Sequence, residues 1–246
     1  MGEIKVLPDV EALTSKALEV IIAAAQSAIQ DRGQFSMALS GGSTPETVYR
    51  ALAAPENRTR LDWAHMHLFW GDERHVPPNH PDSNFRMVKE HLLAVVPIPD
   101  ENVHRVPAEM EVRMAAFHYE EVLRQYFDGE WPRFDLVLLG MGEDGHTASL
   151  FPHSAGLNEE QRWFIANYAP KRKDWRLTLT KNAINAARNI IVLVLGDVKA
   201  DRLRKVLTGP EKPEDNPIQL IRPSDGQMVW LLDREAAKYL PDDLRG

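Results

Sequence analysis

Residues 134–152, FDLVLLGMGEDGHTASLFP, join a mostly apolar run to a glycine-rich polar turn. The run at 134–139 is typical of a strand that is covered on both faces of a parallel sheet. Gly140, Gly142 and Gly145 then interrupt it. In open α/β sheets, ligands bind just beyond the carboxyl ends of such strands. The stretch therefore predicts a ligand site directly after this strand.

The rest of the chain alternates between helical and strand-like patterns, which favours an α/β fold with a mostly parallel sheet. We expect helices at 9–29, 47–52, 85–93, 109–127 and 199–207. We expect strands at 35–39, 65–70, 134–139, 163–167, 176–180, 190–195 and 228–232, and a surface loop at 209–217. Because no repeat, low-complexity tract or long linker is found, we expect a single domain over residues 1–246.

The composition is that of a folded, acidic chain. Of its 246 residues, 43% are hydrophobic, which is enough for a sizeable core and excludes a disordered chain. The formal net charge of -7 argues against binding nucleic acid through bulk electrostatics. Cysteine is absent, which excludes disulfides, thiol catalysis and thiolate metal sites.

The sequence also bears on the location of the protein. Residues 1–20 contain no basic segment followed by a long apolar core, so we expect no signal peptide. The longest apolar runs, such as 190–195, are far shorter than the span of a bilayer. We therefore expect a soluble, cytoplasmic protein that contacts no membrane.

Two loops follow other predicted strands. In SGGSTP, Gly41 and Gly42 let the backbone approach a ligand, while Ser43 and Thr44 add hydroxyl donors at the start of a helix. This pattern suits a phosphate or sugar-phosphate, although ordinary helix-capping turns share it. The second loop runs from Phe69 to Asn84.

That second loop, FWGDERHVPPNHPDSN, places Asp72 and Arg74 immediately after a strand. The planar guanidinium of Arg74 can bind a carboxylate, a phosphate or a developing oxyanion. A solvated charge cluster is an equally good interpretation of this loop alone.

The third loop, GMGEDGHTASLFP, carries Asp144 and His146 two residues apart. A carboxylate that orients an imidazole is a common arrangement in general acid–base catalysis. A capping Asp with a surface His is the alternative, and three glycines within six residues beside a strand end argue against it. The other histidines show no helical His-x-x-x-His pair, so we expect no metal.

With these three loops in order, the chain resembles the 6-phosphogluconolactonases, which belong to a superfamily that includes glucosamine-6-phosphate deaminases and isomerases. The resemblance covers nearly the whole chain and includes WRLTLT and NAINAARNIIVLVLGDVKA after the third loop. It implies a three-layer α/β/α fold with a Rossmann-like, mostly parallel central sheet (NagB/RpiA-like). The implied activity is hydrolysis of 6-phosphoglucono-δ-lactone to 6-phosphogluconate in the oxidative pentose phosphate pathway.

One position separates the branches of the superfamily. Deaminases carry a further carboxylate in a pattern like GHIAFNEP, and Phe151 stands at that position here. Amine chemistry needs the extra acid–base group, so a deaminase or isomerase is the weaker interpretation. A non-catalytic sugar-phosphate sensor is a further alternative, although a sensor would not need both Asp144 and His146.

The resemblance also implies roles for individual residues. His146 is expected to activate the attacking water, with Asp144 orienting its ring, and Arg74 to stabilise the oxyanion or hold the phosphate. Residues expected to bind the rest of the substrate are Gly41, Gly42, Ser43, Thr44, Asp72, Arg176 and Lys199. The reaction needs no cofactor. The only expected partner is a phosphorylated sugar lactone, and the protein is expected to be a monomer or weak homo-oligomer.

Overall fold

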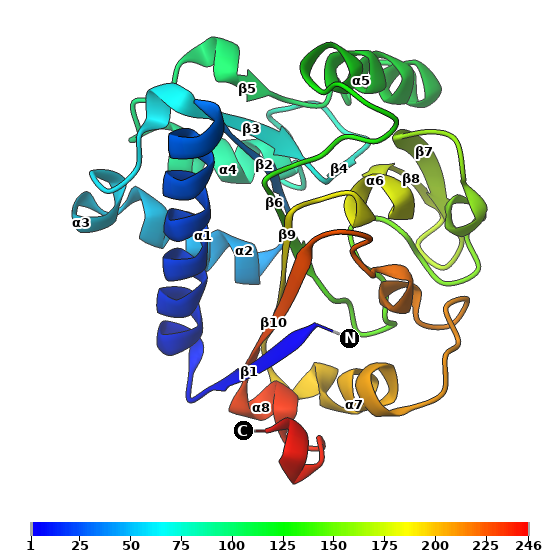
Figure 1. Cartoon of the computed structure of the whole chain (residues 1–246). Helices are drawn as coiled ribbons and strands as arrows, with labels where there is room; N and C mark the ends of the chain where they lie inside the picture. Colours follow the sequence, from blue (N-terminus) through cyan, green and yellow to red (C-terminus); the bar gives the residue numbers. More distant parts are fainter. Residues whose placement is uncertain (1, 246) are drawn as a thin grey trace.

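A computed structural model describes residues 2–245 and contains two sheets (Figure 1). The large sheet has seven strands in the order β1-β10-β9-β6-β2-β3-β5, and all of its neighbouring strands pair in parallel. Its strands are β1 (Glu3–Leu7), β2 (Phe35–Leu39), β3 (Met66–Trp70), β5 (Val103–His104), β6 (Leu136–Gly140), β9 (Asn189–Val194) and β10 (Gln227–Asp233). The predicted α/β fold with a parallel central sheet is confirmed.

Helices flank this sheet, with α1 on one side and α6 and α7 on the other (Figure 1). The helices are α1 (Val10–Arg32), α2 (Ser43–Ala53), α3 (Pro55–Arg58), α4 (Asn84–Val88), α5 (Val112–Tyr126), α6 (Lys181–Asn185), α7 (Ala200–Thr208) and α8 (Arg234–Ala237). The apolar residues of the central strands are almost fully buried between these layers, which explains why the strands show no polar alternation.

By length and composition alone, α1 could cross a membrane, although the sequence predicted no membrane contact. Seven of its residues are buried, and they recur at helical spacing from Leu13 to Ala28. This face packs against α2 and against strands β2 and β10 of the large sheet. Packing within the fold therefore accounts for the apolar character of the helix.

The small sheet corrects one expectation. Strands β7 (Phe164–Ala169) and β8 (Asp174–Leu179) were predicted as strands, but they lie outside the large sheet. In the small sheet β8 pairs antiparallel with β7 on one side and with β4 (Asp72–Arg74) on the other. The segment at 72–74 was expected to be part of a loop. Its pairing with β8 fixes the backbone of Asp72 and Arg74 and places Arg74 opposite Arg176.

Other differences concern the ends of elements. Strand β1 and the short helices α6 and α8 were not predicted, and α2 begins at Ser43 rather than at Pro45. Helix α5 begins at Val112, where the Glu111 carboxylate accepts hydrogen bonds from the first turn. The helix expected at 85–93 is α4 followed by one π-helical turn, Lys89–Leu93.

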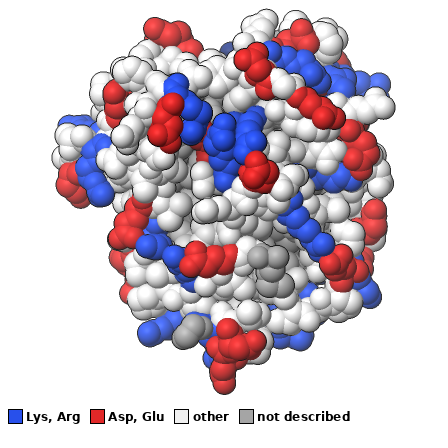
Figure 2. Space-filling model, in the orientation of Figure 1, with Lys and Arg blue, Asp and Glu red and all other residues white. Residues whose placement is uncertain are grey.

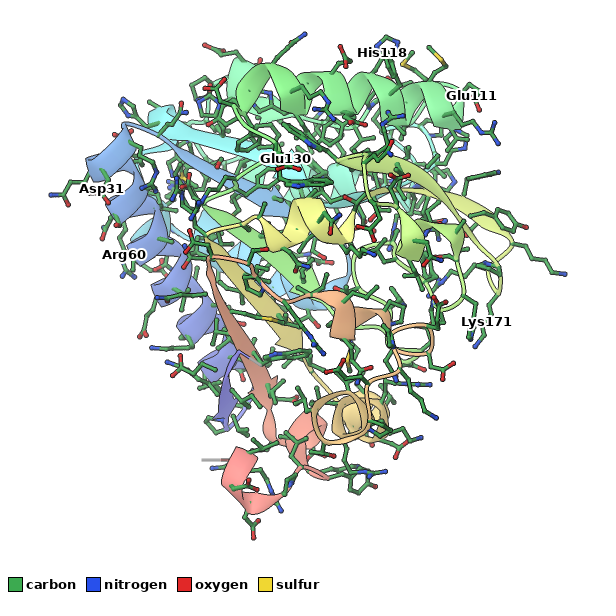
Figure 3. All side chains as sticks on the ribbon, turned by 45° about the vertical axis from the view of Figure 1, so that its right-hand side comes forward. Asp31, Arg60, Glu111, His118, Glu130 and Lys171 are labelled. Atoms are coloured by element: carbon green, nitrogen blue, oxygen red, sulfur yellow. The ribbon has the colours of Figure 1, made fainter. Side chains whose placement is uncertain are left out.

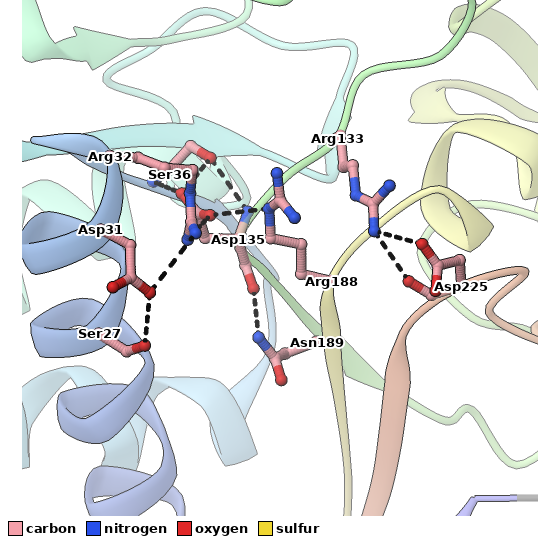
Figure 4. Close-up of polar contacts among 9 residues, drawn as sticks. All are labelled: Ser27, Asp31, Arg32, Ser36, Arg133, Asp135, Arg188, Asn189 and Asp225. Carbon is pink, nitrogen blue, oxygen red and sulfur yellow. Dashed lines mark hydrogen bonds and ion pairs between the residues drawn. The ribbon is translucent and has the colours of Figure 1, made fainter.

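At the amino-terminal edge of the large sheet, the buried carboxylate of Asp135 joins several elements (Figure 4). It accepts hydrogen bonds from Arg32 at the end of α1 (2.8 Å) and from the backbone N–H (2.8 Å) and hydroxyl (3.0 Å) of Ser36. Arg188, just before β9, lies 3.4 Å away. This cluster is structural, because the polar loops predicted as the site leave the sheet at its opposite edge.

Candidate active site

A pocket of about 200 Å³ lies at the carboxyl ends of β9, β6, β2 and β3. The chain runs from β2 outward to β5 and then crosses to β6 on the other side of β2. Ligands of open α/β sheets bind at such a reversal of strand order. The pocket is lined by Ser40, Gly41, Gly42, Ser43, Thr44, Pro45, Asp72, Arg74, Gly140, Met141, Gly142, His146, Ala148, Leu193 and Lys199. Eight of the ten residues predicted for the site belong to this lining.

The imidazole of His146 is held by Asp144, a ninth predicted residue, which lies just behind the lining. Asp144 Oδ1 is 2.5 Å from His146 Nδ1 and also accepts a hydrogen bond from the His146 backbone N–H (3.2 Å). Burial raises the pKa of Asp144, but the hydrogen bond and charge of His146 outweigh it and bring the pKa down to about 2. An ionised Asp144 fixes a proton on Nδ1 and leaves Nε2 of His146 as the basic nitrogen.

The turn that carries this pair depends on two of its glycines. A side chain at Gly142 would collide with the ring of His146, and Gly145 has a φ of 83°, a left-handed conformation that favours glycine. The turn is closed by hydrogen bonds from Gly142 N–H to His146 C=O (2.9 Å) and from Gly145 N–H to Gly142 C=O (3.0 Å). The ring of Phe151 packs against His146, with centroids 4.6 Å apart.

The glycine loop after β2 presents the start of α2 to the pocket. Gly42 is the N-cap of α2, with a φ of 101° and no side-chain cap, so the first N–H groups of the helix have no capping side chain. Helix N-termini of this kind attract anions. The loop is held by the Tyr49 hydroxyl, which donates to Ser40 C=O (2.8 Å) and accepts from Ser40 N–H (2.9 Å).

Asn84 connects the loops after β2 and β3 and was not predicted as a site residue. A Cβ at Gly41 would collide with its side chain, so the glycine permits close approach of the two loops. Asn84 Nδ2 donates to Asp72 C=O at 2.9 Å. The DSN motif was visible in the sequence, but no sequence signal indicated which loop its Asn would contact.

Asp72 and Arg74 enter the pocket from β4. The carboxylate of Asp72 is buried and accepts a hydrogen bond from the hydroxyl of Ser149 (2.7 Å), a second residue that sequence reasoning missed. This bond ties the loop after β3 to the loop after β6. Arg74 donates to the carbonyl of Asp82 at 2.6 Å, which turns its guanidinium along the pocket wall.

Lys199 supplies the second cation of the pocket. It precedes α7 and lies opposite the glycine loop across the end of β9. Burial lowers the pKa of Lys199, although Glu143 and Asp233 nearby act in the opposite direction. Within residues 2–245 it forms no ion pair, so its ammonium group is available to an anionic ligand.

Arg176 lies outside this lining. It is the cross-strand partner of Arg74 in the small sheet, so the two side chains leave the sheet on the same face. Its guanidinium is bound to the carboxylate of Asp174 at 2.6 Å. The sequence did not reveal this competitor, because Asp174 lies one residue before the WRLTLT motif, at the start of β8.

The arrangement combines a base, two cations and helix N–H groups around a small polar space. It suits water-dependent attack on a small anionic substrate, since no hydroxyl of the described residues is hydrogen-bonded to His146 Nε2 as a nucleophile would be. Within residues 2–245, no group of three or more His, Cys, Asp or Glu side chains is placed to hold a metal ion.

Comparisons with known proteins agree with this geometry. Residues 8–230 match the family model for glucosamine-6-phosphate isomerases/6-phosphogluconolactonase. The chain is 42% identical over 241 residues to a 6-phosphogluconolactonase of Nostoc sp., covering 96% of this chain and 98% of the relative. It is 40% identical over 242 residues to a 6-phosphogluconolactonase of Synechocystis sp., covering 97% and 98%. A solved 6-phosphogluconolactonase from Trypanosoma cruzi superimposes with a TM-score of 0.84 at 30% identity, covering 98% of this chain and 97% of that one.

Proposed function

This chain belongs to the glucosamine-6-phosphate isomerase/6-phosphogluconolactonase family, and we propose that it hydrolyses 6-phosphoglucono-δ-lactone to 6-phosphogluconate with His146 as the general base. It is an enzyme of the lactone-hydrolase branch, since two curated relatives that are 40% and 42% identical over nearly the whole chain are 6-phosphogluconolactonases. The observation that carries the mechanism is the Asp144–His146 pair beside a pocket with two cations.

In the proposed reaction, His146 Nε2 removes a proton from a water molecule as its oxygen attacks the lactone carbonyl. The bond between the carbonyl carbon and the ring oxygen then breaks, and the imidazolium returns the proton to the departing oxygen. Asp144 keeps the ring in position and stabilises the imidazolium between the two steps. Arg74 stabilises the tetrahedral oxyanion or grips the phosphate, and Asp72 binds sugar hydroxyls.

We place the phosphate against Gly41, Gly42, Ser43 and Thr44, where the N–H groups at the start of α2 meet the ammonium group of Lys199. Arg176 lies beside Arg74 and can therefore contribute to this site. To do so, its guanidinium exchanges the carboxylate of Asp174 for the phosphate of the ligand.

Phe151 supports a lactonase rather than a deaminase. Its buried ring packs on His146 where amine chemistry would need a carboxylate. A sugar-phosphate sensor would need the cations but not the ordered Asp144–His146 pair.

We further propose that the chain acts as a single domain in the cytoplasm, as a monomer or weak homo-oligomer, without nucleic acid or membrane. Acidic and basic side chains are interspersed on the face drawn in Figure 2, which agrees with this view.

The activity can be tested by measuring the rate of acid release after the protein is mixed with freshly generated 6-phosphogluconolactone. We expect release well above the spontaneous rate, and a much lower kcat/KM on unphosphorylated gluconolactone, because that substrate leaves the cations of the pocket unpaired. Glucosamine 6-phosphate should release no ammonia. Release at the spontaneous rate would overturn the proposal, and ammonia release would favour the deaminase.

Replacing Lys199 with Gln is expected to raise KM about tenfold or more while kcat changes little. A hydrogen bond to a charged group contributes about 1.5–3 kcal/mol, and this one holds a part of the substrate that does not react. Steady-state kinetics measures both constants. The matched control is Lys238→Gln, because Lys238 lies in the same region of the fold and pairs with Asp197 outside the pocket. An effect confined to kcat would contradict a phosphate role for Lys199.

A further inference from the structure

We propose that a second cavity binds a small phosphorylated metabolite, separately from the substrate, and that this binding lowers turnover. The cavity is bounded by α7, the loop at 209–216, the turn at 152–153 and Lys171, and we call it the α7 cavity. Its volume is about 500 Å³, compared with about 200 Å³ for the catalytic pocket. This size falls within the usual range of small-molecule sites. The binding itself is independent of the proposed lactonase activity, whereas the effect on turnover rests on it.

The α7 cavity concentrates positive charge in a chain whose net charge is -7. Five cationic side chains line it: Lys171, Arg202, Arg204, Lys205 and Lys212. The carboxylates lining it are Asp144 and Asp215, and a third, Asp201, pairs with both Arg204 and Lys205. Five cations against three carboxylates leave two positive charges, which match a phosphate monoester dianion.

Three of these cations are open to a ligand. Within residues 2–245, Lys171, Arg202 and Lys212 form no ion pair with a carboxylate. Lys171 lies on the turn between β7 and β8, at the end of the small sheet that faces α7 and the loop after it (Figure 3). The surface loop predicted at 209–217 contains Lys212, which forms one wall of the cavity.

Arg202 is fixed between the cavity and the catalytic turn. Its Nε donates to the carbonyl of Glu143 (3.1 Å) and its Nη1 donates to Asn216 Oδ1 (2.9 Å). These bonds use neutral acceptors, so the positive charge of the guanidinium is not neutralised. A planar guanidinium held in this way is suited to one face of a phosphate, while the two lysines supply point charges.

Asp144 connects the α7 cavity to the catalytic base, because it lines the cavity and is also hydrogen-bonded to His146. The loop beyond α7 is hydrogen-bonded to the same turn, from Ile218 N–H to Gly145 C=O at 3.1 Å. A dianion bound by Arg202 competes with the Glu143 carbonyl for the N–H groups of this guanidinium, which loosens the turn that orients His146. The base is then less well placed to activate water, so kcat falls while the phosphate site of the catalytic pocket is untouched.

Binding can be tested by calorimetric titration of the whole protein with inorganic pyrophosphate. We expect Lys171→Gln/Lys212→Gln to weaken binding at this site at least tenfold, because two charge-assisted contacts are lost. Lys199→Gln should retain it. The double variant Lys16→Gln/Lys89→Gln removes equal charge elsewhere and should bind like the wild type. Unchanged binding in the first variant, or loss of all binding in Lys199→Gln, would overturn the proposal.

The same probe tests the effect on turnover. At saturating pyrophosphate we expect kcat on the lactone to fall about fivefold, which is at the low end of typical coupling between sites. The fall should disappear in Lys171→Gln/Lys212→Gln. A purely competitive rise in KM, or inhibition that persists in this variant, would place the probe in the catalytic pocket and refute the coupling. If no lactonase activity is found, the calorimetric result still decides whether the α7 cavity binds an anion.

Discussion

Replacing His146 with Ala is expected to lower kcat for lactone hydrolysis by about 10²–10⁴-fold, the usual contribution of a general base. The imidazole is the only base in the pocket that is held by a carboxylate, among the residues that the structure describes. A water molecule cannot replace it, because no other group would remove the proton as the carbonyl is attacked. KM should change little, since the cations and helix N–H groups that bind the phosphate remain in place.

The measurement is initial-rate acid release with the spontaneous rate subtracted, together with circular dichroism to verify the fold. His118→Ala is the matched control, because His118 lies on the outer side of α5, far from the pocket (Figure 3). Near-normal turnover in a folded His146→Ala protein would remove His146 as the base.

The large sheet and the main loops of the site could be predicted because both depend on local sequence. Strand β6 is apolar as it is covered on both faces, and glycines mark the point where it ends. Parallel strands place all their carboxyl ends at one edge, so the loops after β2, β3 and β6 had to meet there.

What could not be predicted depends on contacts between distant segments. The pairing of β4 with β8 cannot be recognised in the sequence of either segment, and so no second, antiparallel sheet was predicted. The close approach of Gly41 to Asn84 and the Ser149–Asp72 hydrogen bond likewise join residues that are far apart in the chain. The pairing of Arg176 with Asp174 depends on the rotamers of two charged side chains, which no periodicity reveals.

Glu73 was also missed, and replacing it with Ala is expected to lower the free energy of unfolding by about 3 kcal/mol or more. Its buried carboxylate accepts hydrogen bonds from the backbone N–H groups of Asn84 (2.7 Å), Phe85 (2.8 Å) and Arg74 (2.8 Å). Alanine would leave these donors without a partner, and each unsatisfied buried group costs about 1–3 kcal/mol. Urea denaturation measures the loss, and Glu56→Ala on the exposed side of α3 is the matched control.

The substitution should also lower activity, because Glu73 holds the start of α4 against the strand that carries Asp72 and Arg74. Under assay conditions in which it is folded, the Glu73→Ala protein should therefore show a reduced kcat/KM. Glu73→Gln retains one carbonyl oxygen and should fall between alanine and the wild type. A stability equal to that of the wild type in Glu73→Ala would show that the three N–H groups find other partners.

The pH dependence of stability gives this interpretation an independent test. Burial raises the pKa of Glu73 to about 7, against the opposing effect of its three backbone hydrogen bonds. Between its unfolded value of about 4.5 and this folded value, the folded chain binds more protons than the unfolded chain. The contribution of Glu73 is therefore fully present below the unfolded pKa and is lost as the pH rises through about 7. The free energy of unfolding should fall between about pH 6 and about pH 8 by more in the wild type than in Glu73→Gln, because glutamine does not titrate. An equal difference in both proteins would mean that Glu73 stays ionised throughout, held so by its three N–H donors.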